Sequence, residues 1–162
     1  MRKYYLIVAW FLVIAWMGTI FYLSHQPANT SSELSSGITQ IVVGIIETII
    51  PFIEIDLDVW HFLIRKSAHF IAYFLLGVFI VHALIVSRMQ VFQSGLLAII
   101  ISLLYAISDE IHQLYIPGRS GEVRDVIIDT LGASTGVLLF VLCVLVFERR
   151  QQKKRKTDNF IG

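Results

Sequence analysis

The stretch 105–136 carries most of the residues whose chemistry could serve a function, and apolar runs flank it on both sides. Its ionisable and amide side chains are Asp109, Glu110, His112, Gln113, Arg119, Glu122, Arg124, Asp125 and Asp129. Ionisable groups at membrane depth are costly and usually mark a functional site. We therefore treat this polar stretch as the candidate site and the rest of the chain as its scaffold.

Three of these residues, Asp109, His112 and Gln113, are spaced so that a helix places them on one face. Imidazole titrates near neutral pH and suits acid–base chemistry, while carboxylate with imidazole also suits zinc, iron or manganese. The spacing is common in helices, and a metal-free polar network explains it more simply. We expect no metal and no cofactor, and the candidate catalytic residues are Asp109, His112 and Asp125.

A second polar stripe lies in an apolar run upstream of this stretch. Arg65, His69, Tyr73 and Gly77 recur at four-residue steps along one side of a helix, and Lys66 also reaches that side. Arg65 and Lys66 could extend to lipid headgroups, and His69 with Tyr73 could form only an interhelical hydrogen bond. Because His69 and Tyr73 lie deeper in the run, we expect them to face other helices.

Downstream, Asp125 and Asp129 continue at four-residue steps into Gly132 and Gly136. Small residues spaced in this way let membrane helices approach closely. If the glycines face the bundle, both carboxylates on the same stripe must face it as well. The pattern therefore predicts acidic groups packed against a neighbouring helix.

The loop PGRSGEVR brings Arg119 and Arg124 beside these acids, and two interpretations remain open. Structural ion pairs, such as Asp125 with Arg119, would neutralise buried carboxylates. Alternatively, the arginines bind an anion, because arginine forks fit phosphate and a nearby lysine adds a point charge. On the second interpretation the ligand-binding residues are Lys66, His69, Tyr73, Glu110, Gln113, Arg119, Arg124 and Asp129.

The composition places the chain in the membrane class. Of its 162 residues, 56% are hydrophobic and 15% are charged, with a mean hydropathy of +0.74, and soluble domains usually carry more charge. The net charge of +1 argues against nucleic acid as a partner. Cys143 is the only cysteine, so an intrachain disulfide is excluded.

Four apolar runs are long enough to cross a bilayer and predict an all-α, polytopic membrane helix bundle. The predicted transmembrane helices are 4–23, 62–86, 91–115 and 122–147. A fifth run, 38–52, is too short to span, and we expect a short interfacial or re-entrant helix there. Residues 1–150 would form a single membrane domain, followed by a basic, disordered cytoplasmic tail at 151–162.

The basic residues predict an orientation. With four spans, both termini and the short connection near Arg88 share one side of the membrane, which holds nine of the thirteen basic residues. The other four are Arg65, Lys66, Arg119 and Arg124. Cytoplasmic segments carry an excess of lysine and arginine, so we expect both termini in the cytoplasm and the polar stretch at the outer face of the plasma membrane.

At these residues the chain resembles the VanZ family of small bacterial membrane proteins. The resemblance lies in RKSAHFIAYFLLG, in SDEIHQLYIPGRSGEVRDVIIDTLGASTG and, more weakly, in FYLSHQP. It implies a helical protein of the cell envelope, in a family named for a role in teicoplanin resistance. Position 129 is Asp where the resemblance leads us to expect Asn in many relatives, which counts against a scheme that needs a neutral amide there.

Three function classes follow from these observations. The first is a cell-envelope protein whose outer-leaflet pocket binds an anionic membrane lipid, a lipid-linked cell-wall precursor or a lipoglycopeptide, which would link it to glycopeptide (teicoplanin) resistance. The alternative is a membrane-embedded hydrolase or transferase that acts on a lipid phosphate or glycan through Asp and His chemistry. In the third class the charges only hold the helices together.

Overall fold

The chain folds into five helices, and the prediction of an all-α fold is confirmed. The computed structural model describes residues 2–50 and 56–161. The helices are α1 (Arg2–Ser24), α2 (Ala28–Ile49), α3 (Leu57–Val86), α4 (Val91–Gln113) and α5 (Val123–Ile161). All except α2 are long and apolar enough to cross a membrane, which agrees with the four predicted spans.

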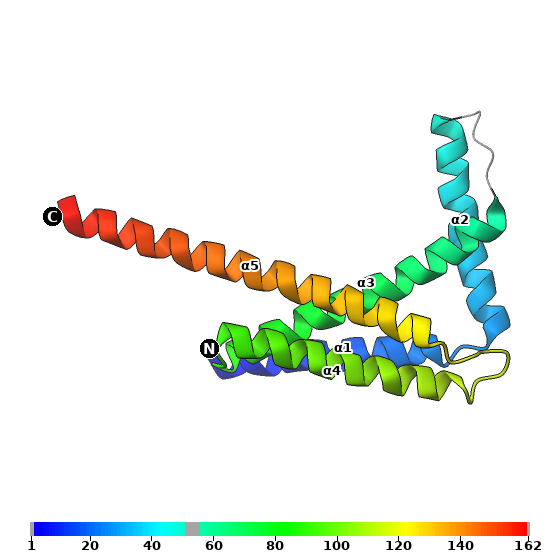
Figure 1. Ribbon diagram of the computed structural model, residues 1–162, viewed down its shortest axis with the longest axis horizontal. Helices are drawn as coiled ribbons and strands as arrows, with labels where there is room; N and C mark the ends of the chain where they lie inside the picture. Colours follow the sequence, from blue (N-terminus) through cyan, green and yellow to red (C-terminus); the bar gives the residue numbers. More distant parts are fainter. Residues whose placement is uncertain (1, 51–55, 162) are drawn as a thin grey trace.

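Helix α3 is the centre of the arrangement. Figure 1 shows α1 and α4 side by side, with α3 and α5 crossing them and α2 running across the first part of α3, at a steep angle to α1 and α4. The contacts of α3 with α5 are the most extensive between any two helices. The connections α1–α2 and α4–α5 lie together at one end of the bundle, which we call the polar end (Ser24, Lys66, His69, Asp109, Glu110, Gln113, Arg119, Asp125 and Asp129).

Glycines allow α3 and α5 to pack closely. A Cβ atom on Gly77 would lie 2.5 Å from the carbonyl oxygen of Ala133, and one on Gly132 or Gly136 would collide with the carbonyl oxygen of Phe70 or Phe74. Both glycines of α5 are buried. The prediction that this stripe faces the bundle is therefore confirmed, and it places the polar residues of the two helices within reach of each other.

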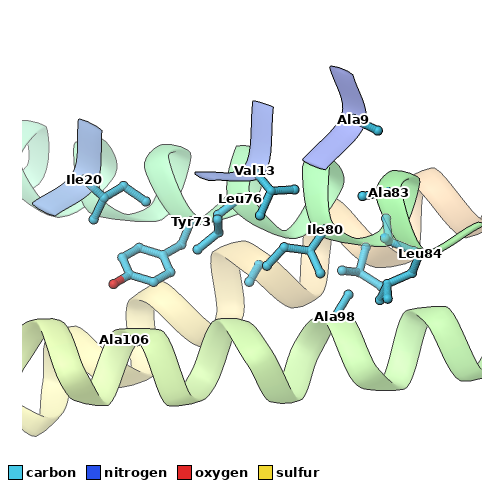
Figure 2. Packing of buried hydrophobic residues seen from close by; sticks show 13 residues of the cluster. Ala9, Val13, Ile20, Tyr73, Leu76, Ile80, Ala83, Leu84, Ala98 and Ala106 are labelled. Atoms are coloured by element: carbon cyan, nitrogen blue, oxygen red, sulfur yellow. The ribbon is translucent and has the colours of Figure 1, made fainter. Parts of the chain in front are cut away.

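Behind the polar end the helices share an apolar core. Figure 2 shows Val13 and Ile20 of α1 above Leu76 and Ile80 of α3, with Ala98 of α4 below them. All of these side chains are buried. Trp16 Nε1 of α1 donates a hydrogen bond of 2.8 Å to the Ala72 carbonyl oxygen of α3, and this bond helps to fix the position of α1 on α3.

Three boundaries differ from the sequence prediction. Helix α2 begins at Ala28 rather than at 38, directly after Pro27, and ends at Ile49, while residues 51–52 lie outside the described part of the chain. Helix α3 begins at Leu57 because the Asp56 side chain caps it by accepting from the amides of Asp58 and Val59. Helix α5 continues to Ile161, so 151–161 is helical where we expected no regular structure.

Helix α2 is attached to α3 by a polar contact. The Thr39 hydroxyl is fully buried and lies 3.0 Å from His61 Nδ1. Since α2 is not among the helices that could span a membrane, its place across the bundle is compatible with the interfacial helix that the sequence predicted.

Candidate functional site

Helices α3, α4 and α5 bring their polar residues together at the polar end. Asp109, Glu110 and Gln113 come from the last turns of α4, and Asp125 and Asp129 come from the first turns of α5. None of these five side chains is more than 5% exposed. Burial of this many carboxylates requires partners for each of them.

Lys66 and His69 of α3 approach three carboxylates at or just before the start of α5. Lys66 Nζ contacts Asp125 Oδ1 directly and lies 3.3 Å from Glu122 Oε2. One helical turn further, His69 Nδ1 lies 3.4 Å from Asp129 Oδ1. Lys66 is therefore already neutralised by two carboxylates of the same protein.

Glu110 holds the α4–α5 loop against α4 by hydrogen bonds. Its Oε2 atom accepts a 2.8 Å hydrogen bond from the Glu122 amide, and its Oε1 atom accepts one of 3.3 Å from Gln113 Nε2. The loop is also pressed against α4 at Gly121, where a Cβ atom would lie 2.8 Å from the Glu110 carbonyl oxygen. These contacts hold the start of α5 against the end of α4.

Asp109 connects α4 to α1. Its Oδ2 atom accepts a 2.7 Å hydrogen bond from Ser24 Oγ and lies 3.5 Å from Gln113 Nε2. Ser24 was absent from the predicted site, because a lone serine at the end of an apolar run carries no sequence signal for a contact with a residue 85 positions away.

Arg119 closes the end of α1. Its guanidinium donates to the carbonyl oxygens of Gln26 (2.9 Å) and Leu23 (3.3 Å), and to Gln113 Oε1 (3.2 Å). Free carbonyls at a helix C-terminus favour such a cation. Burial, and then the nearby Arg65 guanidinium, lower the pKa of Arg119. Arg65 and Arg119 both line the same cavity.

A cavity of about 240 Å³ opens between α1, α2, α3 and the end of α4, and we call it the α1–α2 pocket. Its apolar wall includes Ile20, Leu23, Leu34, Ile38 and Ile64, and its polar wall includes Ser24, Arg65, His69, Tyr73, Asp109 and Arg119. Three buried polar atoms of that wall, Arg65 Nε, Tyr73 OH and Asp109 Oδ1, have no hydrogen-bond partner among the described residues. The residues that carry these atoms line the cavity, and buried polar atoms without a partner are uncommon in folded proteins.

The predicted ligand-binding residues and Asp109 and Asp125 divide into four groups around this cavity. His69, Tyr73, Asp109 and Arg119 line the α1–α2 pocket, whereas Glu110, Gln113, Asp125 and Asp129 are buried between the helices. Lys66 pairs with α5 outside the pocket. Arg124 is exposed, and it makes no ion pair within the part of the chain that the structure describes.

The three candidate catalytic residues contact different partners. His112 Nε2 lies 3.2 Å from His25 Nδ1, and its ring stacks on Phe21. Asp109 bonds to Ser24, and Asp125 contacts Lys66. Asp109 and His112 were predicted to lie on one face of a helix, but their side chains have no contact partner in common. Asp109 contacts Ser24, whereas His112 contacts Phe21 and His25.

Comparison with known proteins gives one match. A family model described as VanZ/LLP1 matches residues 9–145, a range that includes every residue of the polar end. No curated protein and no solved structure matches the chain. With four helices able to cross a membrane and a match over most of its length, the chain is a multi-pass membrane protein that belongs to the VanZ/LLP1 family.

Proposed function

We propose that the α1–α2 pocket binds the anionic headgroup of an amphiphile at the outer face of the bacterial cell membrane. The ligand classes are an anionic lipid, a lipid-linked cell-wall precursor and a lipoglycopeptide, the last of which would connect the protein to teicoplanin resistance. Both termini would then lie in the cytoplasm. The observation that carries the proposal is Arg65, which lines the pocket and makes no ion pair within the described residues, and whose Nε atom is buried without a hydrogen-bond partner.

The two walls of the pocket support an amphiphilic ligand. Leu34, Ile38 and Ile64 offer an apolar surface for the first part of a lipid chain, while the guanidinium groups of Arg65 and Arg119 offer donors for phosphate or carboxylate. A volume of about 240 Å³ suits a headgroup better than a whole lipid, since pockets for complete drug-sized ligands run from about 300 Å³ upwards. The rest of the chain would lie in the bilayer.

Two arginines, Arg65 and Arg119, line the same pocket and support an anionic ligand. Arg119 is held by the carbonyl oxygens of Leu23 and Gln26, so it cannot move away from Arg65 without breaking the end of α1. An anion between two like charges relieves their repulsion. Arg119 thus remains a candidate for binding an anion, and Arg65 takes the place of Lys66 and Arg124, because Lys66 already has two partners and Arg124 is exposed.

The test compares two substitutions that remove the same charge. Arg65→Gln alters the pocket, and Arg124→Gln alters an exposed cation at the same end of the bundle. Binding of phosphatidylglycerol, a polyprenyl diphosphate and teicoplanin to the purified protein would be titrated by native mass spectrometry. Loss of a hydrogen bond to a charged group costs about 1.5–3 kcal/mol, so we expect Arg65→Gln to weaken binding of the preferred probe roughly 10- to 100-fold.

The control variant Arg124→Gln shows whether a loss of binding in Arg65→Gln is specific to the pocket. Arg124→Gln should leave binding within about twofold of wild type, because surface charges contribute little. Equal losses in both variants would indicate general surface attraction, and unchanged binding in Arg65→Gln would refute the pocket. The three probes distinguish the ligand classes. Arg119→Glu is a weaker test, since it also removes the hydrogen bonds to the end of α1.

The second candidate function is a membrane-embedded hydrolase or transferase. One observation favours it: Asp109 lines the pocket and its Oδ1 atom has no hydrogen-bond partner among the described residues, so this carboxylate could accept a proton from water or a hydroxyl group. Release of phosphate from the polyprenyl diphosphate by wild type, together with its loss in Asp109→Asn without loss of binding, would establish this activity. Intact substrate after prolonged incubation would reject it.

A further inference from the structure

We infer that His69, Glu110 and Asp129 form a site for one divalent transition-metal ion, between α3, α4 and α5. One ligand atom of each residue lies within 4.8 Å of the other two. Zinc is usually tetrahedral and binds imidazole and carboxylate at about 2.0–2.2 Å, so two ligand atoms of one ion are about 3.4 Å apart. Small side-chain rotations would therefore bring all three atoms to bonding distance.

Asp129 gives the second observation. Its side chain is fully buried, and neither carboxylate oxygen has a hydrogen-bond partner among the residues described. A buried carboxylate without donors is rare in folded proteins, because its lost hydration must be replaced. The His69 ring is its neighbour at 3.4 Å, and a metal ion bound by both would supply what the carboxylate lacks.

The distribution of charge supports a divalent ion. Lys66 is occupied by Asp125 and Glu122. Within the described residues, His69 is the one basic side chain in an ion pair with Asp129, and Glu110 has none. A protonated His69 would balance one of the two carboxylates. A divalent ion with a neutral imidazole would balance both.

The ligand types narrow the choice of ion. One imidazole and two carboxylates suit zinc, manganese or ferrous iron, whereas cuprous ions prefer thiolates and calcium prefers six to eight oxygens. Glu110 is already oriented by the Glu122 amide and Gln113, as ligand carboxylates usually are. His69 also lines the α1–α2 pocket, so the ion would add positive charge next to it.

The first experiment measures metal content. Wild type would be purified without chelators through a tag that carries no histidines, and bound metals would be measured by inductively coupled plasma mass spectrometry. We expect about one equivalent of a transition metal in wild type and a loss of at least tenfold in Asp129→Asn, because a direct ligand is removed. Asp109→Asn is the matched control, since it makes the same change at another buried carboxylate and should retain the metal.

The second experiment uses wild type alone and so does not depend on whether variants fold. Protein treated with EDTA would be titrated with zinc, manganese and magnesium while Tm is recorded, and we expect zinc or manganese to raise Tm. Metal-free protein with an unchanged Tm would overturn the inference in favour of a protonated His69–Asp129 pair. Equal loss of metal in Asp129→Asn and Asp109→Asn would also overturn it, because the metal would then lie elsewhere.

Discussion

Replacing Gly132 with alanine should separate α5 from α3. The new Cβ atom would collide with the backbone carbonyl oxygen of Phe70, and a backbone atom in the middle of a helix cannot rotate out of the way. The helices must therefore shift apart along their whole contact. Insertion of extra atoms into a packed interior typically costs about 1–3 kcal/mol, and we expect the upper part of that range.

A matched control is available in α1. Gly18 is also helical, but a Cβ atom there would meet nothing within 4 Å. Alanine at that position should be neutral or should stabilise the protein by about 0.5–1 kcal/mol, because glycine is a poor helix former. Thermal unfolding of both variants in the same detergent measures the difference.

The functional consequence of Gly132→Ala distinguishes packing from a general loss of stability. Asp129 precedes Gly132 on the same stripe of α5, so displacement of α5 should also lengthen its contact with His69. Metal content and lipid binding should therefore fall at temperatures where the variant is still folded. Equal Tm values for Gly132→Ala and Gly18→Ala would refute the close packing of α3 on α5.

Two further predictions concern the ion pair and the orientation. Lys66→Met should lower the free energy of unfolding by about 3–5 kcal/mol, because Asp125 is left buried and unpaired. Adding Asp125→Leu should recover most of that loss, as measured by unfolding in denaturant. A double variant as unstable as the single variant would contradict this prediction. Ser120→Cys, made together with Cys143→Ala, should react with a membrane-impermeant maleimide on intact cells if the polar end faces outwards, and labelling only after lysis would reverse the proposed orientation.

The sequence predicted those features that depend on local periodicity. The four spanning helices follow from the length of the apolar runs, and the burial of Gly132 and Gly136 follows from their spacing. The burial of Asp125 and Asp129 was inferred from the same stripe, and both are at most 3% exposed. Such features need no knowledge of the neighbouring helix, because one helix face is either buried or exposed as a unit.

The features that the sequence did not predict depend on contacts between distant segments. Ser24 reaches Asp109 only because α1 and α4 lie side by side at that end. The start of α2 at Ala28 brings Leu34 and Ile38 over the α1–α2 pocket, whereas the predicted helix began after Leu34. Without that longer helix, the sequence could not indicate an apolar wall for the site.

Arg65 and Lys66 are adjacent in the sequence but face different neighbours, and we therefore expect them to have different roles. Consecutive residues on an α-helix are about 100° apart, so the two cations cannot face the same neighbour. Lys66 meets Asp125 of α5, whereas Arg65 lines the α1–α2 pocket. His69 lies between these directions, and it both lines the pocket and approaches Asp129. Removal of Lys66 should therefore act mainly on stability and removal of Arg65 mainly on binding, while changes at His69 should alter both.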